Sequence, residues 1–585
     1  MQLQPFFLAA FCGFMLPLPA ALAQTGIGGP GAVYLPSQLD TLSVDHVEVE
    51  FTGTSAGGPS DAQTQQAVRK ITDPWTPGTL SRQYLDKMLE DLRCLPGVAS
   101  VSVEVRPHSD SGQARAALRV IVALQATAPP SAAPAPSANA SDAFPVLYRA
   151  PGTKITTLLG GGHGAFVDGN PWFGDAYTFT VNNPLVQNPA IGADTGSTAA
   201  WVESWIELGL GGVTQIGDTN SAVYGAVSAI AVASRGQDIF RDDPRESVNI
   251  EKAYAGFLWS SEDKQQRLNL SLGRQNFSLN DGFLISMFGS QSNAGPRPGI
   301  YLAPRTTLDH SFVGNYKHGE WAATAFYLDP NEYEPIESHT RLAGANLRYG
   351  SSSKRYADIT YVQAVNSNSK YSTANGVIGT RDGLRTWGIH ARQSGFDAAP
   401  NLWLEGELAH QTHARFSMNA KAGYGTVGYI ARHLPWTPSI SYRYSYFGGD
   451  DPNTATYERF DPLFSGGLSE WLQGISLSKA IKAENRASHR VRLNLAPTQR
   501  LNLTLDWFMH KANELNNYGG SPALAVLQSK DLAKELQFTA RWAISKHLFF
   551  LGIASVAFPG DAIKLATQGN AKNWSTLQAQ LFWSF

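Results

Sequence analysis

The sequence predicts a mainly β protein, in which a transmembrane antiparallel β-barrel of about 16 to 18 strands follows a small N-terminal α/β domain. Three observations lead to this prediction. The last segment of the chain alternates apolar and polar residues and ends on Phe585, similar segments recur along residues 144–585, and an export signal opens the chain. Alternation of this kind gives a strand one apolar face and one polar face.

The composition fits a membrane barrel better than a bundle of membrane helices. Charged residues make up 16% of the chain, below a soluble average of roughly 25%, whereas the 55 Gly, 21 Tyr and 14 Trp are many. The mean hydropathy is only -0.20, as expected when a lipid-facing row and a lumen-facing row average out. The formal net charge of -2 gives no sign of a nucleic-acid partner.

Residues 1–23 are predicted to be a secretory signal peptide. The apolar run closes on Ala21, Leu22 and Ala23, a small-residue pattern that predicts cleavage before Gln24. No later segment offers the run of about 18 apolar residues that a membrane helix needs. We therefore expect the chain in the periplasm, in the outer membrane or outside the cell.

Residues 40–126 predict one small domain with the order β-α-α-β-β. A capping box of Ser60 and Gln63 opens the first helix. The second helix follows Ser81 with its apolar residues on one face, and two alternating strands come after it. Residues 127–143 are almost entirely Ala, Pro, Ser and Thr, which cannot bury a core, so we expect a linker there.

This order, with the strings VDHVEVEFTG, LEDLRCLPGVASVSVEV and ALRVIVAL, resembles a POTRA domain. Such domains are periplasmic modules of outer-membrane insertases and secretion transporters. The resemblance implies a periplasmic domain at residues 40–126 that docks a partner. Another small α/β module is the alternative.

Residues 144–585 are predicted to form the barrel. In one clear segment, Ile440, Tyr442 and Tyr444 alternate with Ser441 and Arg443. Alternation alone does not separate a soluble barrel from a membrane barrel, but the export signal, the number of strands and the aromatic terminus favour lipid outside. Phe585 is then the expected insertion signal that the barrel-assembly machinery recognises.

With lipid outside, the polar row of each strand lines an aqueous lumen, because a charge on the lipid face at mid-depth costs roughly 2–4 kcal/mol. Two interpretations of the lumen charges stay open. Guanidinium groups would grip carboxylates of a passing solute, or acids and arginines would pair and fill the lumen. Six charges of each sign do not decide between them. The candidates are Glu251, Arg348, Asp358, Arg392, Glu405, Glu407, Arg443, Arg490, Arg492, Asp506, Glu535 and Arg541.

Two stretches carry a resemblance to the alginate-export family of outer-membrane proteins. Residues 242–285 hold an acidic stretch, an Ala-Tyr strand and the motif Gly273-Arg274-Gln275, and residues 446–479 hold YERFDPLF at 457–464. The resemblance implies an 18-stranded barrel whose arginine-rich constriction passes an acidic exopolysaccharide outward. The chain departs from this pattern in its balanced lumen charges and in its attached N-terminal domain.

Three motifs inside the barrel have more than one interpretation. Gly273, Arg274 and Gln275 form either a structural cap or a polymer ligand, and Arg274 shares the parity of an apolar row, which places it at the rim, after a bulge or in a misassigned strand. Phe460, Asp461 and Phe464 are expected in an extracellular loop, which would gate the pore if it folded inward. The string GGGHG at 160–164 suggests a flexible, plug-like entry.

The sequence shows no enzymatic constellation, and we expect no cofactor and no metal. His410 and His413 lack a carboxylate placed for metal binding, and Glu405 and Glu407, two apart on one face, are expected to bind cations or nearby Arg. We expect an outer-membrane channel that exports an exopolysaccharide, with the N-terminal domain in the periplasm. A general or saccharide diffusion porin and a POTRA-dependent protein secretion transporter are the alternatives. The expected partners are outer-membrane lipid, the barrel-assembly machinery, a saccharide substrate and a periplasmic protein.

Overall fold

The computed structural model describes residues 43–52, 59–72, 78–79, 85, 88–89, 91–92, 95, 98–107, 115–124, 145–180, 198–263, 265–286, 297–334, 337–352, 355–465, 470–498, 500–545 and 547–585. The predicted signal peptide and the predicted linker lie outside these residues.

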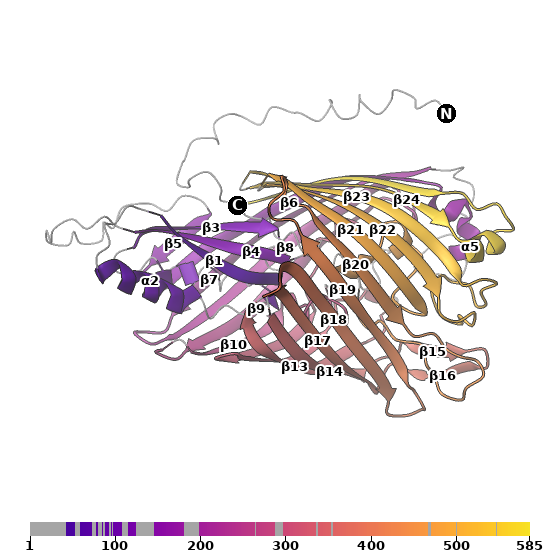
Figure 1. Cartoon of the computed structure of the whole chain (residues 1–585), viewed down its shortest axis with the longest axis horizontal. Coiled ribbons are helices and arrows are strands. Elements are labelled where there is room, and N and C mark those ends of the chain that lie inside the picture. Colours follow the sequence, from indigo (N-terminus) through magenta and orange to yellow (C-terminus); the bar gives the residue numbers. More distant parts are fainter. Residues whose placement is uncertain are drawn as a thin grey trace, which may run out of the picture. The chain divides into compact units, whose positions relative to one another are not determined.

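The fold is dominated by an antiparallel barrel that closes with 18 strands (Figure 1). This confirms the predicted fold class and falls at the upper end of the predicted strand number. The first half of the ring is made by β6 (Thr153–Gly169), β7 (Thr198–Gln215), β8 (Ser221–Gln237), β9 (Arg245–Ser260), β10 (Gln266–Arg274), β11 (His310–His318), β12 (Trp321–Asp329), β13 (Arg341–Ser352) and β14 (Arg355–Asn366). The second half is made by β17 (Leu384–Phe396), β18 (Ala399–His413), β19 (Ala420–Ile430), β20 (Ser439–Phe447), β21 (Arg486–Thr498), β22 (Leu501–Ala512), β23 (Asp531–Ser545), β24 (Leu548–Pro559) and β25 (Trp574–Ser584).

The C-terminal strand closes the ring. β25 pairs with β6 from Ser575 opposite Gly169 to Ser584 opposite Gly160. The short strand β5 (Val146–Ala150) pairs with the beginning of β6. Residues 160–164 are therefore part of a closing strand, and their interpretation as a flexible, plug-like entry is wrong. Glycines are needed there because a Cβ on Gly162 would lie 2.3 Å from Nε1 of Trp205.

The two faces of the strands are inverted relative to a soluble barrel. In β25, Leu577 and Leu581 are 44% and 37% exposed, whereas Thr576, Gln578 and Gln580 are buried. In β20, Ile440 and the alternating tyrosines are exposed and the serines between them are buried. The apolar row of the sequence therefore faces outward and the polar row faces the inside of the ring.

The connections differ between the two ends of the barrel. At one end, where β25 ends, short turns join the strands, as at 151–152, 319–320 and 397–398. At the other end the connections are long and include residues 275–309 and 448–485. The hairpin of β15 (Lys370–Thr373) and β16 (Gly376–Thr380) and the helix α5 (Asp561–Ala566) lie at this second end (Figure 1).

The remaining short elements belong to the long connections. They are η4 (Pro171–Gly174), α4 (Ala176–Thr180), η6 (Glu470–Leu472) and η7 (Leu477–Lys479). Among the described residues, no helix combines the length and the apolarity that a membrane crossing requires.

The described N-terminal residues form a separate four-stranded sheet in the order β2-β1-β4-β3. Its elements are β1 (Ser43–Thr52), α2 (Pro59–Thr72), β2 (Gly78–Thr79), β3 (Val98–Pro107) and β4 (Arg115–Leu124). β1 and β4 run parallel, and β3 and β4 run antiparallel. Leu85, Met88, Leu89 and Leu92 are helical and buried, as the predicted second helix requires. Membership of this sheet in the POTRA type stays a prediction.

Candidate functional site

The twelve charged candidates all lie on barrel strands between β9 and β23, with their side chains in the buried, inward row. Arg443 shows the pattern, since it is 3% exposed and lies between the outward-facing Tyr442 and Tyr444. Arg541 is the exception in burial, because it is half-buried. The structure brings most of them into two groups, one on β13–β18 and one on β20–β22.

The first group is a continuous chain of ion pairs across the inner wall. Arg348 contacts Asp358 at 3.0 Å, and Arg392 contacts Glu405 at 2.8 Å. His390 joins the two pairs, with Nδ1 3.3 Å from Asp358 and Nε2 3.2 Å from Glu405. The sequence prediction missed His390, although it precedes Arg392 by two residues and so shares its inward parity.

Glu407 belongs to the same patch of wall. It is 2% exposed, and its Oε2 has no hydrogen-bond partner among the described residues. Gly388 lies next to it, with a hypothetical Cβ 3.3 Å from Oε1 of Glu407. The expected pairing of Glu405 with an arginine is present, whereas Glu407 faces this group without such a contact.

The second group forms a basic stripe, which we define as Arg443, Arg486, Arg490 and Arg492 on β20 and β21. All four are buried in the inward row, and β20 and β21 contain no Asp or Glu. Arg443 and Arg490 stand directly opposite each other. Like charges directly opposite each other in a sheet are unfavourable. The pair of Arg443 and Arg490 concentrates positive charge on one side of the wall all the same.

Aromatic rings and one acid border the basic stripe. The guanidinium of Arg443 lies 4.9 Å from the ring centre of Tyr424 and 4.6 Å from that of Trp471. Arg492 makes a two-pronged contact with Asp506 on the next strand, at 2.6 and 2.9 Å. The even count of charges in the sequence therefore hides an uneven distribution around the wall.

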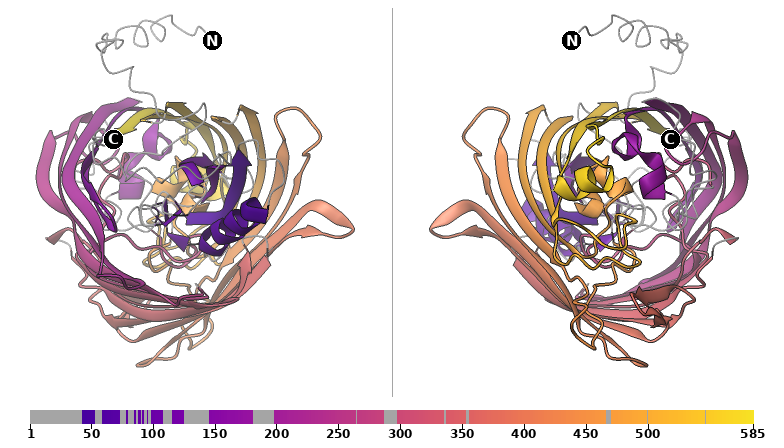
Figure 2. Two further views of the ribbon diagram at one scale, coloured as in Figure 1. Left: turned by 90° about the vertical axis from the view of Figure 1, so that its left-hand side faces the viewer. Right: turned by 90° about the vertical axis from the view of Figure 1, so that its right-hand side faces the viewer.

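Two long connections fold into the barrel. We call the described residues between β10 and β11, 275–286 and 297–309, loop A, and those between β20 and β21, 448–465 and 470–485, loop B. Inward-facing wall side chains hold both loops, as described below. In the right-hand view of Figure 2, the yellow helix α5 and a short orange helix lie within the outline of the strand ring.

Wall glutamates hold the loops through pairs of backbone N–H groups. Glu203 on β7 accepts hydrogen bonds from the amides of Tyr301 (3.0 Å) and Leu302 (2.8 Å) in loop A. Glu251 on β9 accepts hydrogen bonds from the amides of Thr306 (2.8 Å) and Thr307 (3.2 Å), also in loop A.

Loop B is held in the same way. Glu535 on β23 accepts hydrogen bonds from the amides of Ser476 (3.1 Å) and Leu477 (2.9 Å). Glu251 and Glu535, two of the predicted pore-lining acids, thus hold loops in this structure. Glu203 was not among the predicted lumen residues. It shares its row with Trp201 and Trp205, and this aromatic row looks like a lipid-facing row in the sequence.

Asp461 fastens the middle of loop B to the wall and to the connection before β17. Its carboxylate accepts hydrogen bonds from Nε of Arg381 (2.8 Å) and from the hydroxyl of Tyr371 (2.6 Å). Its own amide donates to Gln411 on β18. Burial disfavours the carboxylate, but the charge and hydrogen bonds of Arg381 and the hydrogen bond of Tyr371 outweigh burial, so the pKa of Asp461 lies below its usual value.

The extracellular position expected for Phe460, Asp461 and Phe464 stays a prediction. They lie in a connection at the long-loop end, and that connection folds inward. Phe460 is fully buried and packs against Phe283 of loop A, with ring centres 6.4 Å apart. The amide of Phe464 donates to the carbonyl of Leu284, which joins loop B to loop A.

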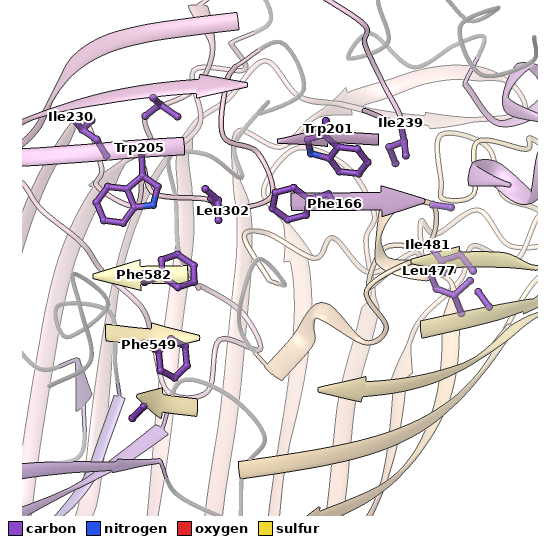
Figure 3. Packing of buried hydrophobic residues seen from close by; sticks show 14 of the residues in the cluster. Phe166, Trp201, Trp205, Ile230, Ile239, Leu302, Leu477, Ile481, Phe549 and Phe582 are labelled. Carbon is purple, nitrogen blue, oxygen red and sulfur yellow. The ribbon is translucent and has the colours of Figure 1, made fainter. Parts of the chain in front are cut away.

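Loop B also reaches the closing strands. The ammonium of Lys479 contacts Asp168 on β6 and lies 5.1 Å from the ring centre of Tyr301. The rings of Phe166 and Trp201 stack there at 5.2 Å, and Figure 3 shows these two rings together with Leu302, Leu477 and Ile481. Loops A and B and the wall therefore share one packed interior.

The motif Gly273-Arg274-Gln275 is a structural cap at the end of β10. Arg274 donates to the carbonyl of Ile250 on β9 and contacts Asp309 at the end of loop A. Gly273 has a φ of +121°, and a Cβ there would lie 2.4 Å from the carbonyl of Ala253. Arg274 thus sits at the rim, one of the three positions that its parity allowed.

Within the described residues, no group of three or more His, Cys, Asp or Glu side chains is arranged to hold a metal ion. The buried polar groups instead contact one another and the loops. The arrangement is that of a charged conduit whose interior is occupied by two held loops.

Comparison with known proteins gives one family match. The family model described as alginate export matches residues 204–576, which is more than half of the chain. No curated protein matches the chain.

Several solved barrels are similar in structure. OmpF of Salmonella typhi, in complex with daunomycin, is 13% identical, with 74% of this chain and 98% of that chain covered and a TM-score of 0.36. OccK5 of Pseudomonas aeruginosa is 10% identical, with 74% and 98% covered and a TM-score of 0.43. OprD of Pseudomonas aeruginosa is 8% identical, with 73% and 93% covered and a TM-score of 0.44.

Proposed function

Because the chain belongs to the alginate-export family of outer-membrane channels, we propose that its cargo is an acidic exopolysaccharide that leaves the cell through the barrel. The observation that carries the proposal is the basic stripe. A polyuronate has a carboxylate on each sugar, and guanidinium groups bind carboxylates through short charge-assisted hydrogen bonds. Four arginines on two neighbouring strands, with no acid on those strands, offer successive contacts to such a polymer.

The acids of the wall do not oppose this proposal, since most of them have partners. Glu251 and Glu535 hold loop amides, and Asp358, Glu405 and Asp506 hold arginines. A paired carboxylate repels a passing anion less than a lone one, because its partner cancels most of its field. The stripe therefore dominates the charge that a polymer would meet on its side of the wall.

Passage of a polymer requires loops A and B to leave the interior. We propose that both loops form the gate, since Phe464 and Leu284 join them and Asp461 fastens loop B to Arg381 and Tyr371. Breaking the contacts of Asp461 would then release the two loops together.

The short-turn end of the barrel is proposed to face the periplasm, because outer-membrane barrels have short periplasmic turns and longer extracellular loops. β6 begins and β25 ends at this short-turn end. The chain that precedes β5 would then lie in the periplasm, where the N-terminal domain is proposed to dock a partner that delivers the polymer.

Single-channel currents of the full chain in planar bilayers test the cargo. We expect oligouronates to block the current at concentrations at least about tenfold below those of neutral oligosaccharides of equal length. The double variant R443Q/R490Q should weaken the block by at least about tenfold, since each hydrogen bond to a charged group contributes roughly 1.5–3 kcal/mol and 1.4 kcal/mol corresponds to tenfold.

The matched control is R348Q/D358N, a pair that lies outside the basic stripe. It removes one buried charge of each sign from a contacting pair, so the net charge of the wall is unchanged and the block should stay near that of the wild type. Equal block by acidic and neutral oligomers, in all variants, would instead identify a diffusion porin.

A further inference from the structure

Basic side chains gather on the outer face of the barrel at the long-loop rim of β17–β19. His410 on β18 stands directly opposite Lys421 on β19 and directly opposite Trp387 on β17. Arg385 precedes Trp387 by two residues and lies on the same face, one step nearer the rim. All four side chains are exposed. Directly opposite Cβ atoms in a sheet are about 4.5–5.5 Å apart, so the four form one patch.

The charge of this patch is not balanced on its own face. β17–β20 contain only two acids, Glu405 and Glu407, and both are in the inward row. In the connections at the long-loop end, next to the patch, Asp382 forms an ion pair with Arg415. No ion pair of Arg385 or Lys421 occurs within the described residues.

The position of the patch on the barrel fits the boundary between lipid headgroups and acyl chains. It is at the long-loop end, which faces outward in barrels of this kind. The next row toward the membrane centre is apolar, with Ile389 and Leu408 59% and 68% exposed and Gly423 beside Leu408. Trp387, 51% exposed, belongs to the aromatic girdle that marks this boundary.

Nearer the membrane centre than the patch, the outer face carries small residues. Gly406 and Gly425 stand opposite each other, and Tyr444 is the next residue in the same row. A Cβ on Gly425 would find no atom within 4 Å. This row therefore leaves room for an acyl chain directly under the basic residues.

We propose that Arg385, His410 and Lys421 bind a phosphate of an outer-leaflet glycolipid, a lipid with a phosphorylated sugar headgroup of the lipid A type. Arg385 supplies a planar fork for the phosphate oxygens and Lys421 a compact charge. Acyl chains lie over Leu408 and along the row of Gly406 and Gly425. This site is independent of the cargo, and it fixes the barrel against the leaflet on the β17–β19 side.

Binding of lipid A to the full chain in detergent tests the site, with dephosphorylated lipid A and inorganic phosphate as the comparison ligands. We expect phosphorylated lipid A to bind at least tenfold more tightly than the dephosphorylated form. We expect R385Q/K421Q to remove this preference, and inorganic phosphate at equal concentration to leave the lipid bound.

The matched control is R355Q, because Arg355 is exposed on the outer face of β14 at the short-turn end. It should bind lipid A like the wild type. Heat-modifiability of each variant shows that the barrel has formed, and the charge-reversal variant K421E repeats the test if the double variant does not fold. Equal binding of the two lipid forms, unchanged binding by R385Q/K421Q, an equal loss in R355Q, or displacement by inorganic phosphate would overturn the proposal.

Discussion

The buried acids of the lumen fall into two sets, those that hold loop backbone and those that hold side chains of the wall. Glu203, Glu251 and Glu535 each hold two consecutive backbone amides of a loop, and Asp358 and Glu405 hold side chains of the wall. A carboxylate that accepts two N–H groups replaces the water those groups lose on burial, and an unmade hydrogen bond of this kind costs about 1–3 kcal/mol. These acids therefore determine where the loops lie.

Asp461 is the residue at which we expect the gate to be most sensitive. Asp461→Asn removes the charge that faces the buried Arg381 guanidinium, and an uncompensated buried charge costs about 3–5 kcal/mol. Planar-bilayer recordings should show loop B released, as a higher open probability than in the wild type. Asp451→Asn, in the same loop, is the control, since the hydrogen bonds of Asp451 within the described part of the chain join it to its near neighbours Asn453 and Thr454. Gating of D461N that matches the wild type would remove Asp461 from the gate.

The pH dependence of the gate follows from the same carboxyl. The pKa of Asp461 is lowered from its usual 3.8 in the folded chain, so its contribution is fully present above 3.8 and is lost as the pH falls through the lower folded value. The part of the rise in open probability that is due to Asp461 should come only below about pH 4. D461N should lack this rise.

At the scale of elements, the closing pair β6–β25 depends on glycine. A Cβ on Gly162 would meet Trp205 at 2.3 Å and Phe582 at 2.9 Å, both in the packed interior. Gly162→Val should therefore prevent β25 from pairing, seen as loss of heat-modifiability on gels and of β signal in circular dichroism. Ala165→Val is the control, because Ala165 is exposed on the outer face of the same strand. A heat-modifiable G162V barrel would contradict the packing argument.

Strands and their faces could be predicted from the sequence, but the paths of the connections could not. The alternation around Arg443 shows both the strand and the inward face, since lipid outside leaves only one place for a buried charge. The contact of Glu251 with the amides of Thr306 and Thr307 depends on how loop A folds back. The local sequence pattern does not predict this path. The prediction of a flexible entry at residues 160–164 was wrong for a related reason. The glycines there are small because side chains far away in the chain pack against them, as Trp205 does against Gly162.

For the whole molecule, the charge pattern matters more than the charge count. The two signs are equal in number among the lumen candidates, yet β20 and β21 carry arginines alone. The ring order of the strands converts a balanced sequence into an uneven wall. That order follows from the antiparallel pairing of sequence neighbours and could be predicted once the strands were known.

The N-terminal sheet and the barrel are expected to contribute separately. Removal of residues 40–126 from the exported chain should leave an inserted pore with unchanged single-channel conductance, since the ring closes through β6 and β25 alone. Export of polymer by cells should fall strongly, because the proposed docking surface is gone. Secretion at the level of the full chain would remove the docking role.

Release of sugars from liposomes that contain the full chain shows directly whether the barrel passes acidic sugars in preference to neutral ones. Liposomes are loaded with an oligouronate and a neutral oligosaccharide of equal length, and the two are measured outside over time. We predict that the oligouronate leaves faster than the neutral sugar, and that R443Q/R490Q removes the difference while R348Q/D358N keeps it. Equal release of both sugars by the wild-type protein would contradict it.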